Sequence, residues 1–342
     1  MRGPLSISPV LLHFWRKFCP NRYIRVLRKA NLTSYNFKMS ITKTSTVWMV
    51  ARLNYSEPWL GFLTKSVKPF VDSLTRTGII ERYFFERSFE GGAHIRLYFR
   101  CNPELRDDLV LPNLKEHFEA YFASSPSARR YEKSGLVSNN TLQVADYQPI
   151  ASDWGGEVGL PIAERHFQSS SEAVLQFMAL KGESWCPDDV LATAIELHLG
   201  FADSVGMDVE EAVRFFEYCL VFHAAEEFRV QSMEEFFQTQ KQPLIEFHGK
   251  LWDSLKVKEE FTEEPYNLWL EQCYYTAADI RRTFRQRVLK IEAKFSALWT
   301  MYAKLTSKTN NRLGLFGRDE SLVYYIMMRS LEKIESENSI GK

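Results

Sequence analysis

The sequence predicts an α+β protein in which an N-terminal antiparallel sheet packs with helices and is followed by a mainly helical C-terminal half. Up to about residue 150, short runs rich in β-branched and aromatic residues alternate with helical segments. After Gly156, apolar residues recur mostly at the three- and four-residue spacing of amphipathic helices. Hydrophobic residues make up 45% of the chain, which is enough for a large buried core.

Four strands and two helices are predicted in the first half. Apolar residues from Leu60 to Leu74 share one helical face that stops at Gly78, and a second helix is expected over 112–123. Gly91 and Gly92 predict a hairpin turn between the second and third strands. The strands are expected over 46–55, 79–87, 94–100 and 142–147.

The second half is predicted to be a helical assembly without internal repeats. The stretch 268–304 is long enough for one extended helix or for two helices with a break. The expected helices span 161–180, 187–200, 209–228, 233–255, 268–304 and 321–334.

The charge balance argues against a nucleic-acid binder, because 43 Lys and Arg residues equal 43 Asp and Glu residues. Residues 1–38 contain eight of these basic residues and no acidic one. We interpret 1–38 as a disordered basic extension. The other hypothesis is a tail that binds nucleic acid or a membrane surface. Met39 is an alternative start of the protein. We expect residues 39–342 to form one unit.

No run approaches the roughly 18 apolar residues of a membrane span, so we expect a cytoplasmic protein.

The strand 94–100 carries the most distinctive polar pattern. Its alternation places His94, Arg96 and Tyr98 on one face, opposite an apolar face. Arginine suits bidentate binding of a carboxylate, and tyrosine can donate a hydrogen bond to a carbonyl or oxyanion. A solvated outer sheet face explains the spacing equally well. No phosphate loop, nucleophile elbow or paired metal-ligand motif is present, so no cofactor or metal is expected.

Several short motifs in a fixed order resemble the family of lantibiotic (lanthipeptide) dehydratase C-terminal and thiopeptide-type bacteriocin biosynthesis domains, in a stand-alone form. The resemblance covers roughly 47–331. The motifs are Trp48 with Ala51-Arg52-Leu53, Arg82-Tyr83-Phe84-Phe85, Gly92-Ala93-His94-Ile95-Arg96, Tyr147-Gln148-Pro149, Trp154-Gly155-Gly156, Ala163-Glu164-Arg165-His166-Phe167 with Ser171, and Asn311-Arg312-Leu313-Gly314 with Asp319-Glu320.

The resemblance implies that the chain acts on a ribosomally made precursor peptide that carries a leader. One branch of the family eliminates glutamate from glutamylated Ser or Thr, leaving dehydroamino acids. Another branch joins two dehydroalanines into a pyridine ring and releases the leader. The second reaction depends mainly on positioning, for which Arg96, Tyr98 and Tyr147 would suffice.

The resemblance also implies site residues. His94, Arg96 and Tyr98 are the expected catalytic residues, and the expected substrate-binding residues are Tyr147, Asp153, Ser307 and Arg312. Three of these positions depart from the elimination pattern. Tyr98 stands where family members commonly have a second arginine, Asp153 stands at an expected arginine, and Ser307 stands at an expected histidine. Asp153 would repel a glutamate carboxylate.

The departures leave two further alternatives. In the first alternative, the chain is a non-catalytic subunit of a split dehydratase. It binds the precursor peptide and presents it to a separate glutamylating subunit. The remaining alternative is a housekeeping helical protein with coincidental motifs.

Overall fold

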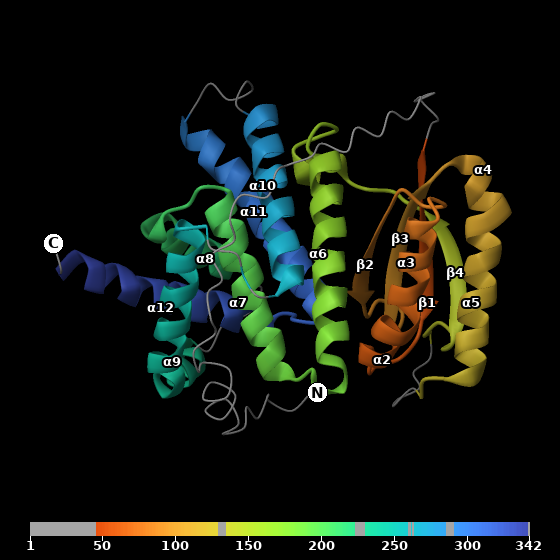
Figure 1. The fold of residues 1–342 in the computed structure, drawn as a ribbon, viewed down its shortest axis with the longest axis horizontal. Coiled ribbons are helices and arrows are strands. Elements are labelled where there is room, and N and C mark those ends of the chain that lie inside the picture. Colours follow the sequence, from red (N-terminus) through yellow and green to blue (C-terminus); the bar gives the residue numbers. More distant parts are fainter. Residues whose placement is uncertain are drawn as a thin grey trace.

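The computed structural model describes residues 46–128, 135–222, 230–258, 261, 263–284 and 291–340. The extension expected over 1–38 lies outside the described residues. A four-stranded sheet with its helices comes first in the chain and is followed by a group of longer helices (Figure 1). The α+β fold predicted from the sequence is therefore confirmed.

The sheet has the connectivity strand, helix, strand, strand, helix, strand. Its strands are β1 (Val47–Asn54), β2 (Arg82–Ser88), β3 (His94–Cys101) and β4 (Thr141–Asp146), in the spatial order β2-β3-β1-β4. All three neighbouring pairs are antiparallel. This is the split β-α-β arrangement, in which each helical connection returns the chain across one face of the sheet. The strands β2 and β4 form the edges of this sheet.

Two helical runs cover one face of the sheet. The first consists of α2 (Leu60–Phe62), η1 (Leu63–Val67) and α3 (Lys68–Arg76), and the second of α4 (Pro103–Leu105), η2 (Arg106–Val110) and α5 (Leu111–Ser124). The apolar row of β3 faces these helices. Phe99 is fully buried, and Phe70 of α3 contacts both Phe99 and Phe118 of α5, with ring centroids 6.2 and 5.1 Å away.

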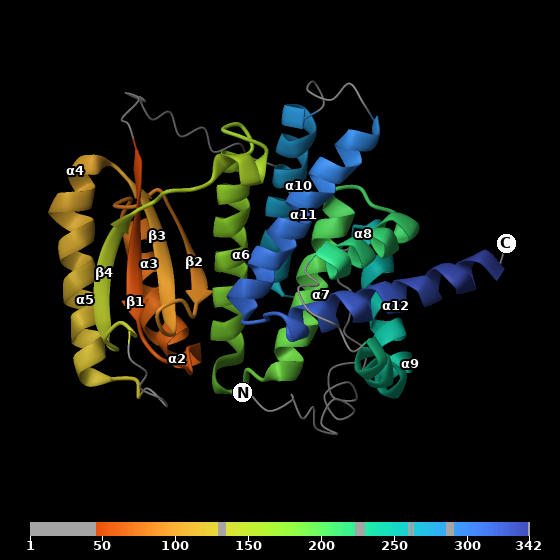
Figure 2. The same cartoon turned by 180° about the vertical axis from the view of Figure 1, so that it is seen from behind.

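The second half is helical, as predicted. Helix α6 (Leu160–Lys181) stands between the sheet and the other long helices (Figures 1 and 2). The predicted helical stretch 268–304 corresponds to two helices, α10 (Glu264–Phe284) and α11 (Ile291–Leu313), and residues 285–290 between them lie outside the described residues. None of the helices in the described parts is long and apolar enough to cross a bilayer. The elements are η3 (Ala151–Trp154), α6 (Leu160–Lys181), η4 (Gly182–Ser184), α7 (Pro187–Ser204), α8 (Val209–Phe222), α9 (Val230–Lys256), α10 (Glu264–Phe284), α11 (Ile291–Leu313) and α12 (Arg318–Ile340).

Side chains from α6 and α11 bond directly to the backbone of the edge strand β2. The Phe85 N–H donates to Ser171 Oγ over 3.1 Å. The amide of Asn311 accepts from the Arg87 N–H and donates to the Arg87 carbonyl, both over 2.9 Å. The helical half is therefore fixed to the sheet through hydrogen bonds as well as apolar packing.

Candidate functional site

A cleft of about 470 Å³ lies between the second face of the sheet, the segment after β4 and helix α11. The sequence predicted seven site residues, and five of them line this cleft: Arg96, Tyr98, Tyr147, Asp153 and Ser307. They come from β3, from the segment that follows β4, from η3 and from α11. The fold thus brings together residues that are up to 211 positions apart in the sequence, as Arg96 and Ser307 are.

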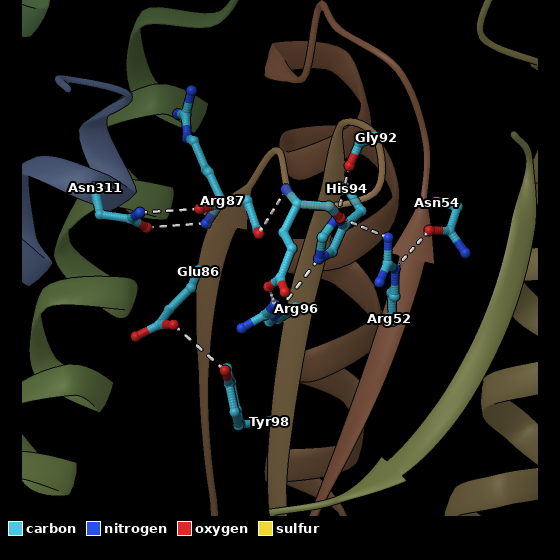
Figure 3. A network of polar contacts seen from close by, with 11 residues as sticks. Arg52, Asn54, Glu86, Arg87, Gly92, His94, Arg96, Tyr98 and Asn311 are labelled. Carbon is cyan, nitrogen blue, oxygen red and sulfur yellow. Dashed lines mark hydrogen bonds and ion pairs between the residues drawn. The ribbon is translucent and has the colours of Figure 1, made fainter. Parts of the chain in front are cut away.

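His94 does not line the cleft but lies fully buried beside Arg96 (Figure 3). Its Nδ1–H donates to the Gly92 carbonyl over 2.8 Å, and its Nε2 accepts from Arg96 Nε over 3.2 Å. Burial lowers the pKa of the imidazole to about 4, and the nearby cations Arg52 and Arg96 add to this effect. His94 is therefore neutral at pH 7 and orients the Arg96 guanidinium.

Glu86 lies in the cleft and was not identified from the sequence. Its carboxylate receives Lys308 Nζ over 2.7 Å and the Tyr98 hydroxyl over 3.3 Å. Burial acts to raise the pKa of this carboxyl, but Lys308 and Arg312 outweigh it, so the pKa lies below its ordinary value. Glu86 is thus a carboxylate at neutral pH, held between two cations and a tyrosine.

Aromatic rings form much of the cleft wall. Tyr98 stacks on Phe84 with a centroid distance of 4.2 Å and meets Tyr147 edge-on at 5.5 Å. Burial raises the pKa of both tyrosines well above the ordinary value, and the carboxylates Glu86 and Glu164 raise it further. Both hydroxyls therefore remain protonated and can donate hydrogen bonds at neutral pH.

Helix α11 lines the cleft with Lys304, Ser307 and Lys308, which share one helical face because they are three and four residues apart. Lys304 Nζ pairs with Asp153 Oδ1 over 2.8 Å. The negative charge of Asp153, which stands at an expected arginine, is thereby neutralised by a lysine from another element.

Arg312 lies behind the cleft and not in its lining. Its guanidinium is fully buried against Phe84 and Phe167, with centroid distances of 5.9 and 5.2 Å. Nε donates to Ser171 Oγ over 2.8 Å, and Nη1 donates to the Lys308 carbonyl over 2.5 Å. Burial lowers the pKa of Arg312 to about 10, so it is still a cation at pH 7. It supports the cleft wall by packing against Phe84 and Phe167, which line the cleft.

No signal in the sequence alone was sufficient to find the site residues that were missed. Glu86 is the register partner of Arg96 on the neighbouring strand, but only the strand pairing reveals this. The two lysines flank Ser307 at helical spacing, a pattern that usually indicates a solvated helix face. Their role at the cleft depends on how α11 packs on the sheet.

A concave site with aromatic walls and a few oriented polar groups is typical of a protein that binds an organic or peptide ligand. Residues 48–331 match the family model described as lantibiotic biosynthesis dehydratase C-term, and the chain therefore belongs to this family. Its function lies in the biosynthesis of a ribosomally made, post-translationally modified peptide, as the motifs predicted.

Several solved structures are similar to this chain in fold over most of its length. One is the pyridine synthase TbtD from thiomuracin biosynthesis, with a TM-score of 0.72 and 14% identity over 85% of this chain and 99% of that chain. A second is the tRNA-dependent lantibiotic dehydratase MibB from Microbispora sp. 107891, with a TM-score of 0.63 and 16% identity over 88% of this chain and 29% of that one.

A third is TsrL, with a TM-score of 0.61 and 16% identity over 85% of this chain and 96% of that one. Because these sequence identities are low, the three comparisons show similarity in the fold alone. A comparison with curated protein sequences finds no match.

Proposed function

We propose that the chain binds a leader-bearing precursor peptide and holds an uncharged, dehydrated core segment in the cleft for a cyclisation of the pyridine-forming type. The similarity in fold and length to a pyridine synthase supports this proposal, since 99% of that chain is covered. The family membership supports the precursor peptide as the partner.

The charge state of the cleft is the observation that carries the choice of reaction. Both lysines that line it already have a carboxylate partner that is itself part of the cleft: Lys304 has Asp153, and Lys308 has Glu86. A glutamyl leaving group would have to compete with these internal carboxylates. An uncharged segment with two dehydroalanines places no such demand on the cleft.

In this proposal the site residues position the reacting groups and polarise carbonyls. Tyr98 and Tyr147 supply hydroxyl donors, Ser307 supplies a third hydroxyl from α11, and Arg96 anchors a backbone carbonyl. The aromatic rings exclude water from the reacting segment. His94 and Arg312 act indirectly, by orienting Arg96 and supporting the wall at Lys308.

Mass spectrometry of the cognate precursor tests the reaction. We expect a precursor that already contains dehydroalanines to be converted into a ring-containing product with release of its leader. A precursor that is only glutamylated should keep its mass. Tyr98→Phe should slow the conversion about 10²-fold, the usual cost of losing one oriented donor, whereas Arg100→Gln on the same strand should leave it unchanged. Loss of glutamate from the glutamylated precursor would identify an elimination enzyme instead.

A non-catalytic peptide-binding subunit is the second candidate. One observation favours it: no histidine lines the cleft in the described part of the chain, and His94 is buried and neutral. In that case the precursor binds without any change in mass and is passed to a separate glutamylating subunit. For either candidate we propose a cytoplasmic protein in which 39–342 is the functional unit and 1–38 is an extension.

A further inference from the structure

Two arginines lie side by side on the sheet face that also forms the cleft. Arg52 of β1 and Arg96 of β3 are direct partners in the strand register, so their side chains project from the same face. Figure 3 shows both, with His94 next to them. Two adjacent guanidinium groups repel each other unless an anion lies between them.

Each guanidinium is held in place by a side chain two residues away on its own strand. Arg52 Nε donates to Asn54 Oδ1 over 2.8 Å, and Arg96 Nε donates to His94 Nε2 over 3.2 Å. The Nη2 atoms of both arginines then meet the same residue, Glu90. Arg52 bonds its backbone carbonyl over 2.8 Å, and Arg96 bonds its carboxylate over 2.7 Å. The pair is thus oriented in advance to bind oxygen atoms.

Glu90 is weakly held compared with the other carboxylates around the cleft. Its side chain is 80% exposed, whereas the side chains of Glu86 and Asp153 are 13% and 46% exposed. It lies in the hairpin turn, directly before Gly91 and Gly92, whose positive φ values of 66° and 114° suit glycine. An exposed ion pair contributes little stability, so Glu90 can give up this position at small cost.

We propose that Arg52 and Arg96 form a binding site for a carboxylate of the precursor peptide, and that Glu90 occupies this site until the peptide arrives. Paired guanidinium groups favour a carboxylate over a neutral amide, because each presents N–H donors in a planar fork. The site lies beside the cleft, with Arg96 common to both. The assignment of the carboxylate to a precursor peptide rests on the proposed function.

Blocked pentapeptides with one central glutamate, or one central glutamine, test the site by calorimetric titration. Glu90→Ala should bind the glutamate peptide roughly tenfold more tightly than the unmodified protein does, the scale of one charge-assisted hydrogen bond. The glutamine peptide should bind equally weakly to both. Glu90→Gln keeps the size of the side chain and should show the same preference. Equal affinity of Glu90→Ala for the two peptides, or no gain over the unmodified protein, overturns the proposal.

Two arginine variants control for nonspecific charge effects. In the Glu90→Ala background, Arg52→Gln should abolish the gain in affinity for the glutamate peptide. Arg100→Gln should leave this gain intact, although Arg100 lies on the same strand and the same sheet face as Arg96. Arg100 pairs with Glu81 over 3.2 Å. If both substitutions reduce binding equally, general electrostatic attraction accounts for the effect and the site does not exist.

The source of the carboxylate is resolved with two forms of the precursor. If an acidic residue of the precursor occupies the site, the precursor binds more tightly to the Glu90→Ala variant than to the unmodified protein. Replacing the Asp and Glu residues of the precursor by Asn and Gln then removes this difference in affinity. If only a glutamylated precursor shows this difference, the site stands while the proposed cyclisation fails. Binding is measured without any product, so the two proposals fail separately.

Discussion

Arg312 illustrates how a residue can shape the cleft without lining it. Its sequence surroundings, Asn310-Asn311-Arg312, give no sign of burial, yet the side chain is completely enclosed. A buried guanidinium requires hydrogen bonds and aromatic contacts to offset its desolvation. The sequence motif identified the residue, but only the packing of α11 against α6 and β2 shows that it acts as a support.

Arg312→Gln should lower the free energy of unfolding by about 2–4 kcal/mol, because it removes a charged hydrogen-bonding group and leaves space behind Phe84. Urea unfolding measures this loss. Arg100→Gln is the matched control and should cost less than about 1 kcal/mol, since Arg100 forms a partly exposed pair. Similar losses for both variants would contradict a supporting role for Arg312.

At the scale of elements, strand alternation was sufficient to predict the polar row of β3, and three- and four-residue spacing was sufficient for the helices. Arg96 and Tyr98 of this row line the cleft, and His94 is buried beside Arg96, so the row is not a solvated face. Glu86 escaped prediction because it follows the buried residues Tyr83 to Phe85 and resembles the end of a core strand. Its importance comes from its neighbours on β3 and α11, which local pattern does not reveal.

The Glu86–Lys308 pair joins strand β2 to helix α11. A double-mutant cycle with Glu86→Gln and Lys308→Met should show a coupling energy of about 1 kcal/mol, since the lysine is about one-third exposed to solvent. Lys308→Met alone should destabilise more than the double variant, because it leaves Glu86 without its nearest cation. Chemical unfolding of the four proteins measures the cycle. Purely additive losses would mean that the pair does not hold the two elements together.

At the scale of the whole molecule, the order of strands and helices was predictable because each element carries its own local signal. The way the helical half docks on β2 was not, because it depends on contacts such as Arg87 with Asn311, 224 positions apart. The cleft forms along this boundary. Five of its residues were nevertheless identified in advance: Arg96 and Tyr98 from the alternation of strand β3, and Tyr147, Asp153 and Ser307 from the family resemblance.

Three histidines buried in the helical half should make the stability of the protein depend on pH. Burial lowers the pKa of His166 to about 3, and of His198 and His248 to about 4, from 6.5. Below pH 6.5 the unfolded chain therefore binds more protons than the folded one. Stability is complete above pH 6.5 and falls as the pH drops toward 4, by about 1.4 kcal/mol per pH unit for each histidine.

Urea unfolding between pH 7 and pH 5 measures this dependence. Glu164 and Glu172 act in the opposite direction, since burial raises the pKa of both carboxyls. His248→Leu isolates the contribution of one histidine and should reduce the slope by about 1.4 kcal/mol per pH unit. An unchanged slope in this variant would show that His248 does not titrate differently in the folded and unfolded states.

The hydrogen bonds that Asn311 and Ser171 make to β2 also bear on how the molecule behaves at high concentration. An edge strand with free N–H and C=O groups can recruit a strand from another molecule and begin aggregation. Asn311 satisfies both backbone groups of Arg87, as a neighbouring strand would, and Ser171 satisfies the N–H of Phe85. The motif residues that fasten the two halves together therefore also protect this edge of the sheet from association with other copies of the chain.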